Sequence, residues 1–171
     1  MLNSFLTFLS RRLVKGVVYA HCDIPCGIYD PHQMQVAAHT VLRMTQLIEE
    51  LEPPKFPLPD VAEAKKKLNS LARYVAVKEE HAELCKREVR ILWGDYFKAE
   101  HLEQYPELHD TVWKVLKVAS TARQEVSLEA AAELLSLTQL IAEVFWKTKG
   151  VETVRGKSFY PTEGEMVYPK V

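Results

Sequence analysis

The chain has 171 residues, of which 47% are hydrophobic and 26% charged, and its formal net charge is −1. This is the composition of an ordinary globular domain, and it gives no general reason to expect nucleic acid or an anionic membrane as a partner. No run of 18 apolar residues predicts a transmembrane helix, and three cysteines are too few, and odd in number, for a disulfide scaffold.

The first twenty residues differ in composition from the rest. They carry a charge of +3, which leaves −4 for the other 151 residues. An apolar stretch comes before the basic residues Arg11, Arg12 and Lys15, which is the reverse of the order in a secretory signal. Residues 1–20 therefore read as a removable leader or a transit peptide, and the alternative is a frayed first helix of the domain.

Two long helices are predicted next. The dipeptide Asp30-Pro31 is a typical helix start, and the prolines that follow Leu51 predict the end of this helix. Asp60 is the predicted N-cap of a second helix that reaches about Phe97, with Lys78 as the one polar position in its apolar seam. Such a helix would be roughly 57 Å long at 1.5 Å per residue, so we expect a break or an overhang near one end.

Two more helices complete the predicted domain. Residues 98–105 read as a connector, Pro106 as the first residue of a third helix, and Ser127 as the N-cap of a fourth that ends at Gly150. Residues 151–171 read as an irregular C-terminal tail, free to pack on a neighbour. Four amphipathic helices joined by short loops predict an all-α fold, an antiparallel up-down four-helix bundle.

The segment before the first helix combines soft metal ligands with turn formers. Cys22 and Cys26 flank Pro25, and Gly27 follows, so the backbone would curl tightly. No second cysteine pair completes a tetrahedral zinc site, and Cys85 lies in a helix seam, where it reads as a small core residue. The two cysteines therefore indicate a metal site of another kind, incidental loop cysteines or a small-loop disulfide.

Cleavage after Ala20 would enlarge the set of donors. His21 would become the N-terminus and offer an α-amine and an imidazole, and the backbone amide of Cys22 could bind as an amidate. With the thiolates of Cys22 and Cys26, these groups form a flat set of two nitrogens and two sulfurs with an axial imidazole. Flat sets that contain nitrogen suit Ni(II) and Cu(II). The anionic donors also favour a higher oxidation state of the metal.

The segment from His21 to Pro31 resembles the nickel hook of the nickel-containing superoxide dismutases. Two further blocks resemble that family in the same order along the chain. One is the stretch LWGDYFK at residues 92–98 with YPELH at residues 105–109, and the other is FWKTK at residues 145–149. On these blocks the chain is identified as a member of this family, with an N-terminal leader.

The resemblance implies a ligand set and a reaction. His21, Cys22 and Cys26 would hold one nickel ion per subunit, and Asp23 would help to order the hook. The nickel would alternate between Ni(II) and Ni(III) while superoxide is converted to dioxygen and hydrogen peroxide. Two protons are consumed in each full cycle.

The resemblance also implies residues and partners around the metal. Tyr29 and Tyr96 would line a small vestibule that holds water or superoxide, and Lys98 would add positive potential near its entrance. The family assembles as a homohexamer, and a dedicated peptidase removes the leader. Because the chain after the leader is net −4, any steering of the superoxide anion must come from local lysines.

The expected organisation is a leader at residues 1–20, a nickel hook with its bundle at residues 21–150, and a tail at residues 151–171. We expect a cytoplasmic protein, with organelle import by the leader as the alternative. Neither nucleic acid nor a membrane is expected as a partner.

The chain departs from the family pattern near the expected metal. Members often have a Glu in the first helix that hydrogen-bonds the axial imidazole and pairs with an Arg on the second helix. The corresponding residues here are Ala37 and His81. Because both partners are replaced, no buried charge is left unpaired, and the imidazole of His21 needs another anchor.

Two functions of other classes compete with the dismutase. A nickel- or copper-binding or trafficking module would use the same hook without turnover, and it would need neither Tyr29 nor Tyr96. A purely structural helix bundle would join the two hook cysteines in a disulfide. Metal content, a thiol count and dismutase activity separate these cases.

Overall fold

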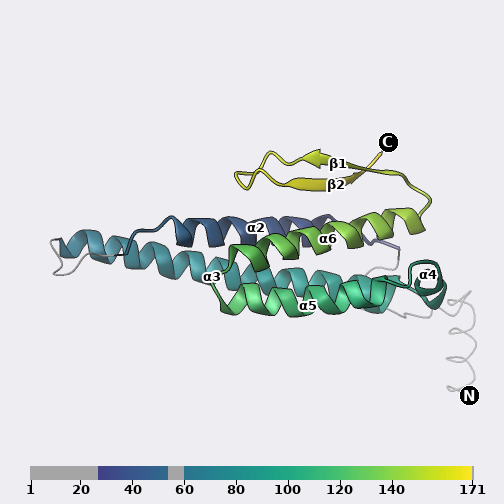
Figure 1. Ribbon diagram of the computed structural model, residues 1–171, viewed down its shortest axis with the longest axis horizontal. Helices are drawn as coiled ribbons and strands as arrows, with labels where there is room; N and C mark the ends of the chain where they lie inside the picture. The colour runs from purple at the N-terminus through teal and green to yellow at the C-terminus, as the bar shows by residue number, and fades with distance from the viewer. Residues whose placement is uncertain (1–26, 54–59, 171) are drawn as a thin grey trace, which may run out of the picture.

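The computed structural model describes residues 27–53 and 60–170, which are mostly helical (Figure 1). Four long helices lie side by side: α2 (His32–Glu49), α3 (Val61–Ile91), α5 (Leu108–Gln124) and α6 (Leu128–Thr148). Helix α3 packs against α2 and α5, and α6 packs against the same two helices. The predicted leader and the predicted hook residues His21, Cys22, Asp23 and Cys26 lie outside the described residues.

No helix in the described part of the chain is long and apolar enough to span a membrane.

Asp60 and Ser127 are the N-caps that the sequence predicts, whereas the N-cap of α2 is Pro31 and Asp30 lies one residue before it. Asp30 Oδ1 accepts from the His32 N–H at 2.7 Å, and α2 begins one residue later than predicted. Asp60 Oδ1 accepts from two N–H groups in the first turn of α3, at 2.8 and 3.2 Å. Ser127 Oγ accepts from a first-turn N–H of α6 at 3.1 Å, and Gly150 ends that helix with φ +71°. These side chains satisfy N–H groups that have no partner within the helix.

The predicted break at the end of the second helix is confirmed. Helix α3 ends at Ile91 and continues as a single π-helical turn, η1 (Leu92–Tyr96). The Phe97 N–H donates to the Leu92 carbonyl, five residues back, at 2.9 Å. The wider turn sets the direction in which Tyr96 leaves the helix, and such π turns are common at functional sites.

The stretch after η1 is more ordered than predicted. Residues 98–105, read as a connector, contain the short helix α4 (Ala99–Gln104). A helix of six residues has room for less than two turns, so its sequence shows no apolar period. The next helix, α5, begins at Leu108 rather than at Pro106.

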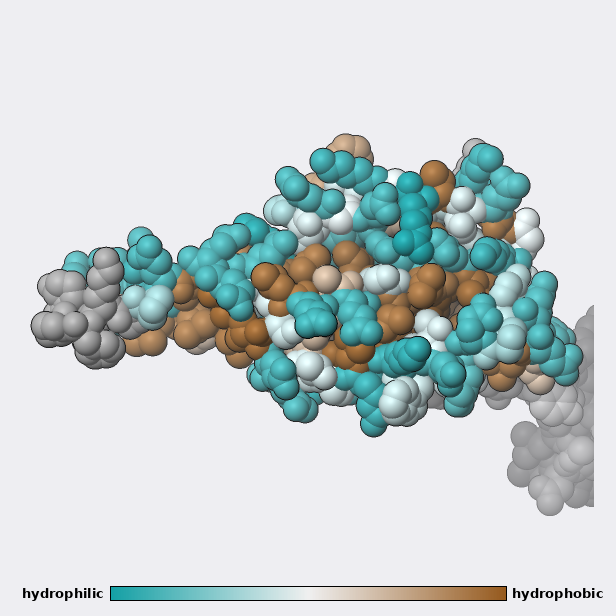
Figure 2. All heavy atoms as spheres, in the orientation of Figure 1, coloured by the Kyte–Doolittle hydropathy of each residue, from teal (hydrophilic) through white to brown (hydrophobic). Residues whose placement is uncertain are grey.

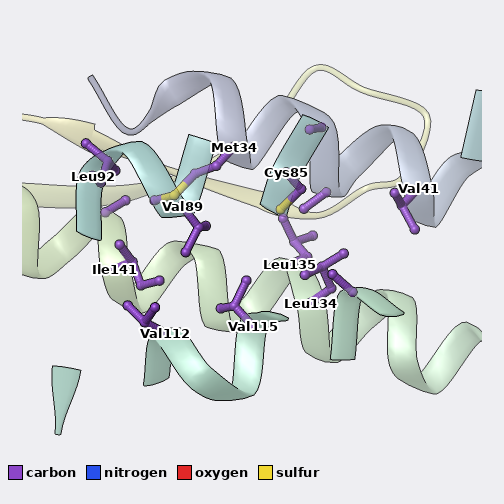
Figure 3. Packing of buried hydrophobic residues seen from close by; sticks show 14 of the residues in the cluster. Met34, Val41, Cys85, Val89, Leu92, Val112, Val115, Leu134, Leu135 and Ile141 are labelled. Carbon is purple, nitrogen blue, oxygen red and sulfur yellow. The ribbon is translucent and has the colours of Figure 1, made fainter. Parts of the chain in front are cut away.

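The core lies between the four long helices (Figure 3). Met34, Cys85, Val115 and Ile141 are fully buried in it and come from four different helices. Cys85 is therefore the core residue that the sequence predicts. Burial raises the pKa of its thiol to about 12, so the thiol stays protonated and poorly reactive.

Lys78 is buried but its ammonium group is fully used. Only 2% of the residue is exposed, and its Nζ donates to the carbonyls of Ala122 at 2.8 Å and Arg123 at 3.1 Å, and also to that of Glu125. These carbonyls belong to the C-terminal end of α5, where the helix dipole favours a positive charge. The polar position in the predicted seam of α3 thus ties α3 to the end of α5.

The interpretation of residues 151–171 as an irregular tail is wrong for most of that stretch. Strands β1 (Thr153–Lys157) and β2 (Glu165–Pro169) form an antiparallel hairpin, in register from Thr153 opposite Pro169 to Lys157 opposite Glu165. The hairpin lies along α2 and α6 (Figure 1). Two strands alone are marginally stable in water, so the hairpin depends on what it packs against.

Glutamine side chains from two helices complete the hydrogen bonding of β2. The Gln35 amide on α2 donates to the Val167 carbonyl at 3.2 Å and accepts from the Val167 N–H at 2.8 Å, as a neighbouring strand would. Gln139 on α6 donates to the Glu165 carbonyl at 2.6 Å. Met166 and Val167 of β2 are both buried. These contacts order a sequence whose strand propensity is weak.

His39 joins α2 to the loop of the hairpin. Its Nε2 donates to the Glu165 carbonyl at 3.1 Å, so in the neutral ring Nδ1 accepts from the Thr162 hydroxyl at 2.7 Å. Burial lowers the pKa of His39, partly opposed by the hydrogen bond to Glu165. The folded chain therefore favours the neutral imidazole.

Candidate metal centre

The described chain begins next to the predicted hook. Gly27 has φ +93°, a left-handed conformation that other residues adopt only with strain. Within residues 27–53 and 60–170, no three His, Cys, Asp or Glu side chains gather as a metal site. The part of the candidate centre that can be described is thus the set of residues predicted to surround the metal.

The two predicted vestibule tyrosines lie together. The rings of Tyr29 and Tyr96 are 5.4 Å apart between centroids and tilted by 53°. The Tyr29 hydroxyl donates to the Asp95 carbonyl at 3.5 Å, at the long limit for a hydrogen bond. Tyr29 precedes α2 and Tyr96 ends η1, so the fold joins two positions that are 67 residues apart.

Tyr96 is the centre of a group of rings, which we call the tyrosine cluster. The ring of Phe145 on α6 is 4.6 Å away and that of Phe97 is 5.2 Å away. The His101 ring stacks on Tyr96 at 5.7 Å with an angle of 21°. The cluster consists of Tyr29, Tyr96, Phe97, His101 and Phe145, and aromatic pairs at such distances stabilise one another.

Two residues at the end of α6 contact Tyr96 and were not predicted as site residues. The hydroxyl of Thr148 lies 2.7 Å from the Tyr96 hydroxyl. The Lys149 Nζ lies 5.2 Å from the ring centroids of both Tyr96 and Phe145, close enough for cation–π attraction. Both residues fall in the FWKTK block, where the sequence alone shows only a helical position and a terminal lysine.

Lys98 stands beside the cluster but points into solvent. Its side chain is 72% exposed, and its Nζ is 4.0 Å from a carboxylate oxygen of Glu100. An exposed pair at this distance contributes little to stability, and the ammonium group adds positive charge beside the cluster. Lys149, over the Tyr96 ring, is a second cation in the same region.

The two positions that depart from the family pattern do not form a replacement pair. Ala37 is fully buried in α2. His81 on α3 donates from Nδ1 to the Val77 carbonyl of its own helix at 2.9 Å. His81 therefore has a local partner, as a histidine with only a structural role would.

Comparison with known proteins decides the family. The family model described as nickel-containing superoxide dismutase matches residues 16–149. The chain belongs to the nickel-containing superoxide dismutase family. The superoxide dismutase [Ni] of Streptomyces coelicolor is 37% identical over 142 residues, which are 82% of this chain and 98% of that protein. The corresponding protein of Streptomyces seoulensis is 35% identical over the same shares.

Solved structures of nickel superoxide dismutases share the fold. A native structure matches with a TM-score of 0.64 at 35% identity and covers 76% of this chain and 99% of its own. A structure with the nickel ligation of the oxidised state matches with a TM-score of 0.62 at 34% identity and the same coverage. The mostly helical fold is confirmed, and the hairpin lies beyond residue 149, where the family match ends.

Membership of this family establishes the activity and the cofactor. The chain is a superoxide dismutase, an oxidoreductase, and its cofactor is nickel. The residue types of the segment around Cys22 and Cys26 fit this ion, because two thiolates together with nitrogen donors suit the flat geometry of Ni(II). Gly27, at the point where that segment joins the described chain, has the backbone freedom that a tight hook needs.

Proposed function

We propose that the active enzyme begins at His21, after removal of residues 1–20, and binds one nickel ion through His21, Cys22 and Cys26. The observation that carries this proposal is the segment HCDIPCGIYDP, which leads directly into the Tyr29 and Tyr96 pair. When bound, nickel supplies a one-electron couple between its divalent and trivalent states. Asp23 orders the hook in this proposal.

The residues of the chain itself handle the small anion and its protons. Tyr29 and Tyr96 line the small space beside the metal that holds water or superoxide, and their packed rings keep that space small. Lys98 raises the local positive potential near the entrance, which matters because residues 21–171 carry a net charge of −4.

We further propose that residues 21–150 form an antiparallel four-helix bundle with an N-terminal hook, and that six chains assemble into a homohexamer. The ring of contacts among α2, α3, α5 and α6 supports the bundle. Trp113 and Leu140 are large apolar residues left exposed on α5 and α6, and Figure 2 shows apolar surface across the middle of one face. Such surface is typical of subunit contacts.

The leader belongs to the same proposal. A dedicated peptidase removes residues 1–20, and the processed enzyme works in the cytoplasm. Residues 1–20 support this proposal by their composition, because they contain Arg11, Arg12 and Lys15 and no acidic residue.

The test compares two chains that differ by one residue at the N-terminus. One begins at His21 and the other retains Ala20, and both are assayed for bound nickel and for dismutase activity. We expect nickel and activity only in the chain that begins at His21, because the amine of His21 must be free to ligate. Equal nickel content and equal activity in the two chains would contradict the proposal.

A matched substitution separates the dismutase from a binding module. Cys22→Ser in the chain that begins at His21 removes one thiolate, and we expect it to abolish nickel-dependent activity. Cys85→Ser is the control, since that thiol is buried in the core. Nickel binding without any turnover in the unmodified chain would favour a metal-binding or trafficking role instead.

A further inference from the structure

The Tyr96 ring is fixed on its faces and edges by its neighbours. Phe145 and Phe97 contact it at centroid distances of 4.6 and 5.2 Å, and the His101 ring stacks on it at 5.7 Å. The Lys149 Nζ lies 5.2 Å from the same ring. With the ring held in this way, the freedom left to Tyr96 is rotation of its hydroxyl proton.

Thr148 fixes the direction of that proton, because its hydroxyl has only one proton to donate. The Thr148 hydroxyl lies 2.7 Å from the Phe145 carbonyl, and a carbonyl can only accept, so Thr148 donates its single proton there. The Lys149 N–H turns to the Trp146 carbonyl at 3.0 Å, which leaves the Phe145 carbonyl to Thr148. In the 2.7 Å contact between the two hydroxyls, Tyr96 must therefore be the donor.

We propose that Thr148 is a positioning residue that turns the Tyr96 proton toward α6 and leaves the Tyr96 oxygen as an acceptor toward the metal centre. This inference rests on the proposed function, which places Tyr96 beside the nickel. An acceptor oxygen can hold a water molecule by its proton but cannot donate to an anion. Tyr96 therefore disfavours the retention of a small anion at this position.

The position of Tyr96 at the end of η1 makes this arrangement possible. The π turn ends with the Phe97 N–H donating to the Leu92 carbonyl, and the chain then becomes extended at Phe97. Tyr96 is thereby presented to the last turn of α6, where Thr148 is the final helical residue. The contact joins two elements that are 52 residues apart in the chain.

Two variants separate the hydroxyl of Thr148 from its bulk. Thr148→Val keeps the shape and removes the hydroxyl, whereas Thr148→Ser keeps the hydroxyl. The first readout is the tyrosine Fermi doublet in the Raman spectrum, which reports whether a phenol donates or accepts. Each spectrum is taken as a difference against the same chain carrying Tyr96→Phe, so that Tyr96 alone is observed. This readout needs no bound nickel.

The second readout is inhibition of the nickel-loaded enzyme by azide, used as a small monoanion. In Thr148→Val the Tyr96 proton is free to turn toward the anion. Azide should then inhibit at about tenfold lower concentration, the lower end of the worth of a hydrogen bond to a charged group. Thr148→Ser should match the unmodified enzyme. Circular dichroism of both variants confirms that they fold equally.

The outcomes distinguish this inference from the proposed function. A donor-type doublet in the unmodified chain that is lost in Thr148→Val and kept in Thr148→Ser supports the inference, together with the azide shift. An acceptor-type doublet in the unmodified chain, or the same doublet in all three chains, overturns it. Equal azide inhibition of the two variants also overturns it. An unmodified chain that binds no nickel overturns the proposed function, while the Raman result still stands on its own.

Discussion

The tyrosine cluster and the C-terminal hairpin are both held across long distances in the chain, but by different interactions. Rings at centroid distances of 4.6 to 5.7 Å surround Tyr96, and one chain of hydroxyl bonds directs its proton. The hairpin is held by buried amides and an imidazole from α2 and α6, which bond to the backbone of β2. The cluster lies within the family match and the hairpin beyond it.

The difference suggests separate roles: we expect the tyrosine cluster to affect the reaction and the hairpin to affect stability. A change in the cluster alters groups beside the proposed metal, so it should affect the rate of dismutation. A change in the hairpin alters buried contacts on α2 and α6, so it should affect the free energy of unfolding. The predictions that follow measure both quantities, the rate being expressed per bound nickel.

The largest effect is expected from Met166→Ala in β2. Met166 is fully buried, and truncation of such a side chain should lower the free energy of unfolding by about 3 kcal/mol. Val154→Ala in β1 is the control, because Val154 is 49% exposed and should change little. Denaturant unfolding gives the stabilities. A loss of dismutase rate per nickel in Met166→Ala would show that the hairpin takes part in the site.

A smaller loss is expected from Gly164→Ala. A Cβ at this position would lie 2.9 Å from Cε1 of His39 and 3.1 Å from Cδ2 of Leu135, so the hairpin loop must shift. Overpacking of this kind costs about 2 kcal/mol. In the control, Gly156→Ala, the nearest atom is Cε2 of Tyr168 at 3.4 Å, an ordinary contact. Equal melting temperatures of the two variants would contradict the described packing against His39.

The burial of His39 against the hairpin should make the free energy of unfolding depend on pH. Burial lowers the pKa of His39 from its ordinary value of 6.5. At pH above 6.5 both states are neutral at this residue and its contribution is complete. As the pH falls below 6.5 the unfolded chain binds the proton first, so the free energy of unfolding decreases toward the lower folded pKa.

The variant His39→Gln should remove this part of the dependence. Unfolding is measured from pH 7.5 to 5 in both chains, and the difference between the two curves isolates His39 from the carboxylates. A difference that does not change with pH would show that His39 is not held neutral.

The smallest effect is expected on the dismutation rate, from a charge change next to the tyrosine cluster. Lys98→Glu should slow dismutation a few fold at low salt, and less as salt is added, because it reverses a charge beside the proposed entrance. Lys65→Glu is the control with the same charge change, on the first turns of α3 and far from α4 (Figure 1). Equal rates of the two variants at low salt would remove Lys98 from steering.

Much of the helical framework could be predicted from sequence because its determinants are local. Asp60 and Ser127 cap the helices that they precede, and a side chain needs only the next three residues to do so. Helix length alone predicted a break or an overhang near one end, and the π turn before Phe97 is the break. The pairing of Tyr29 with Tyr96 was implied by the resemblance, and the structure brings the two rings together.

The rest depends on partners that lie far away in the chain. The sequence of β2 contains Pro169 and a single β-branched residue, Val167, so it does not predict a strand without the amides of Gln35 and Gln139. Thr148 looks like any residue in a helical period until the Tyr96 hydroxyl is seen beside it. No local pattern contains that information.

By itself, the sequence determined the family and the caps at Asp60 and Ser127, because each is a short stretch whose chemistry is complete within it. For the same reason it predicts the hook and its ligands His21, Cys22 and Cys26. Only the tertiary structure decided that residues 153–169 form a hairpin and that Thr148 directs the proton of Tyr96. Both depend on which polar groups are buried together, because a buried donor or acceptor must find its partner wherever the fold places one.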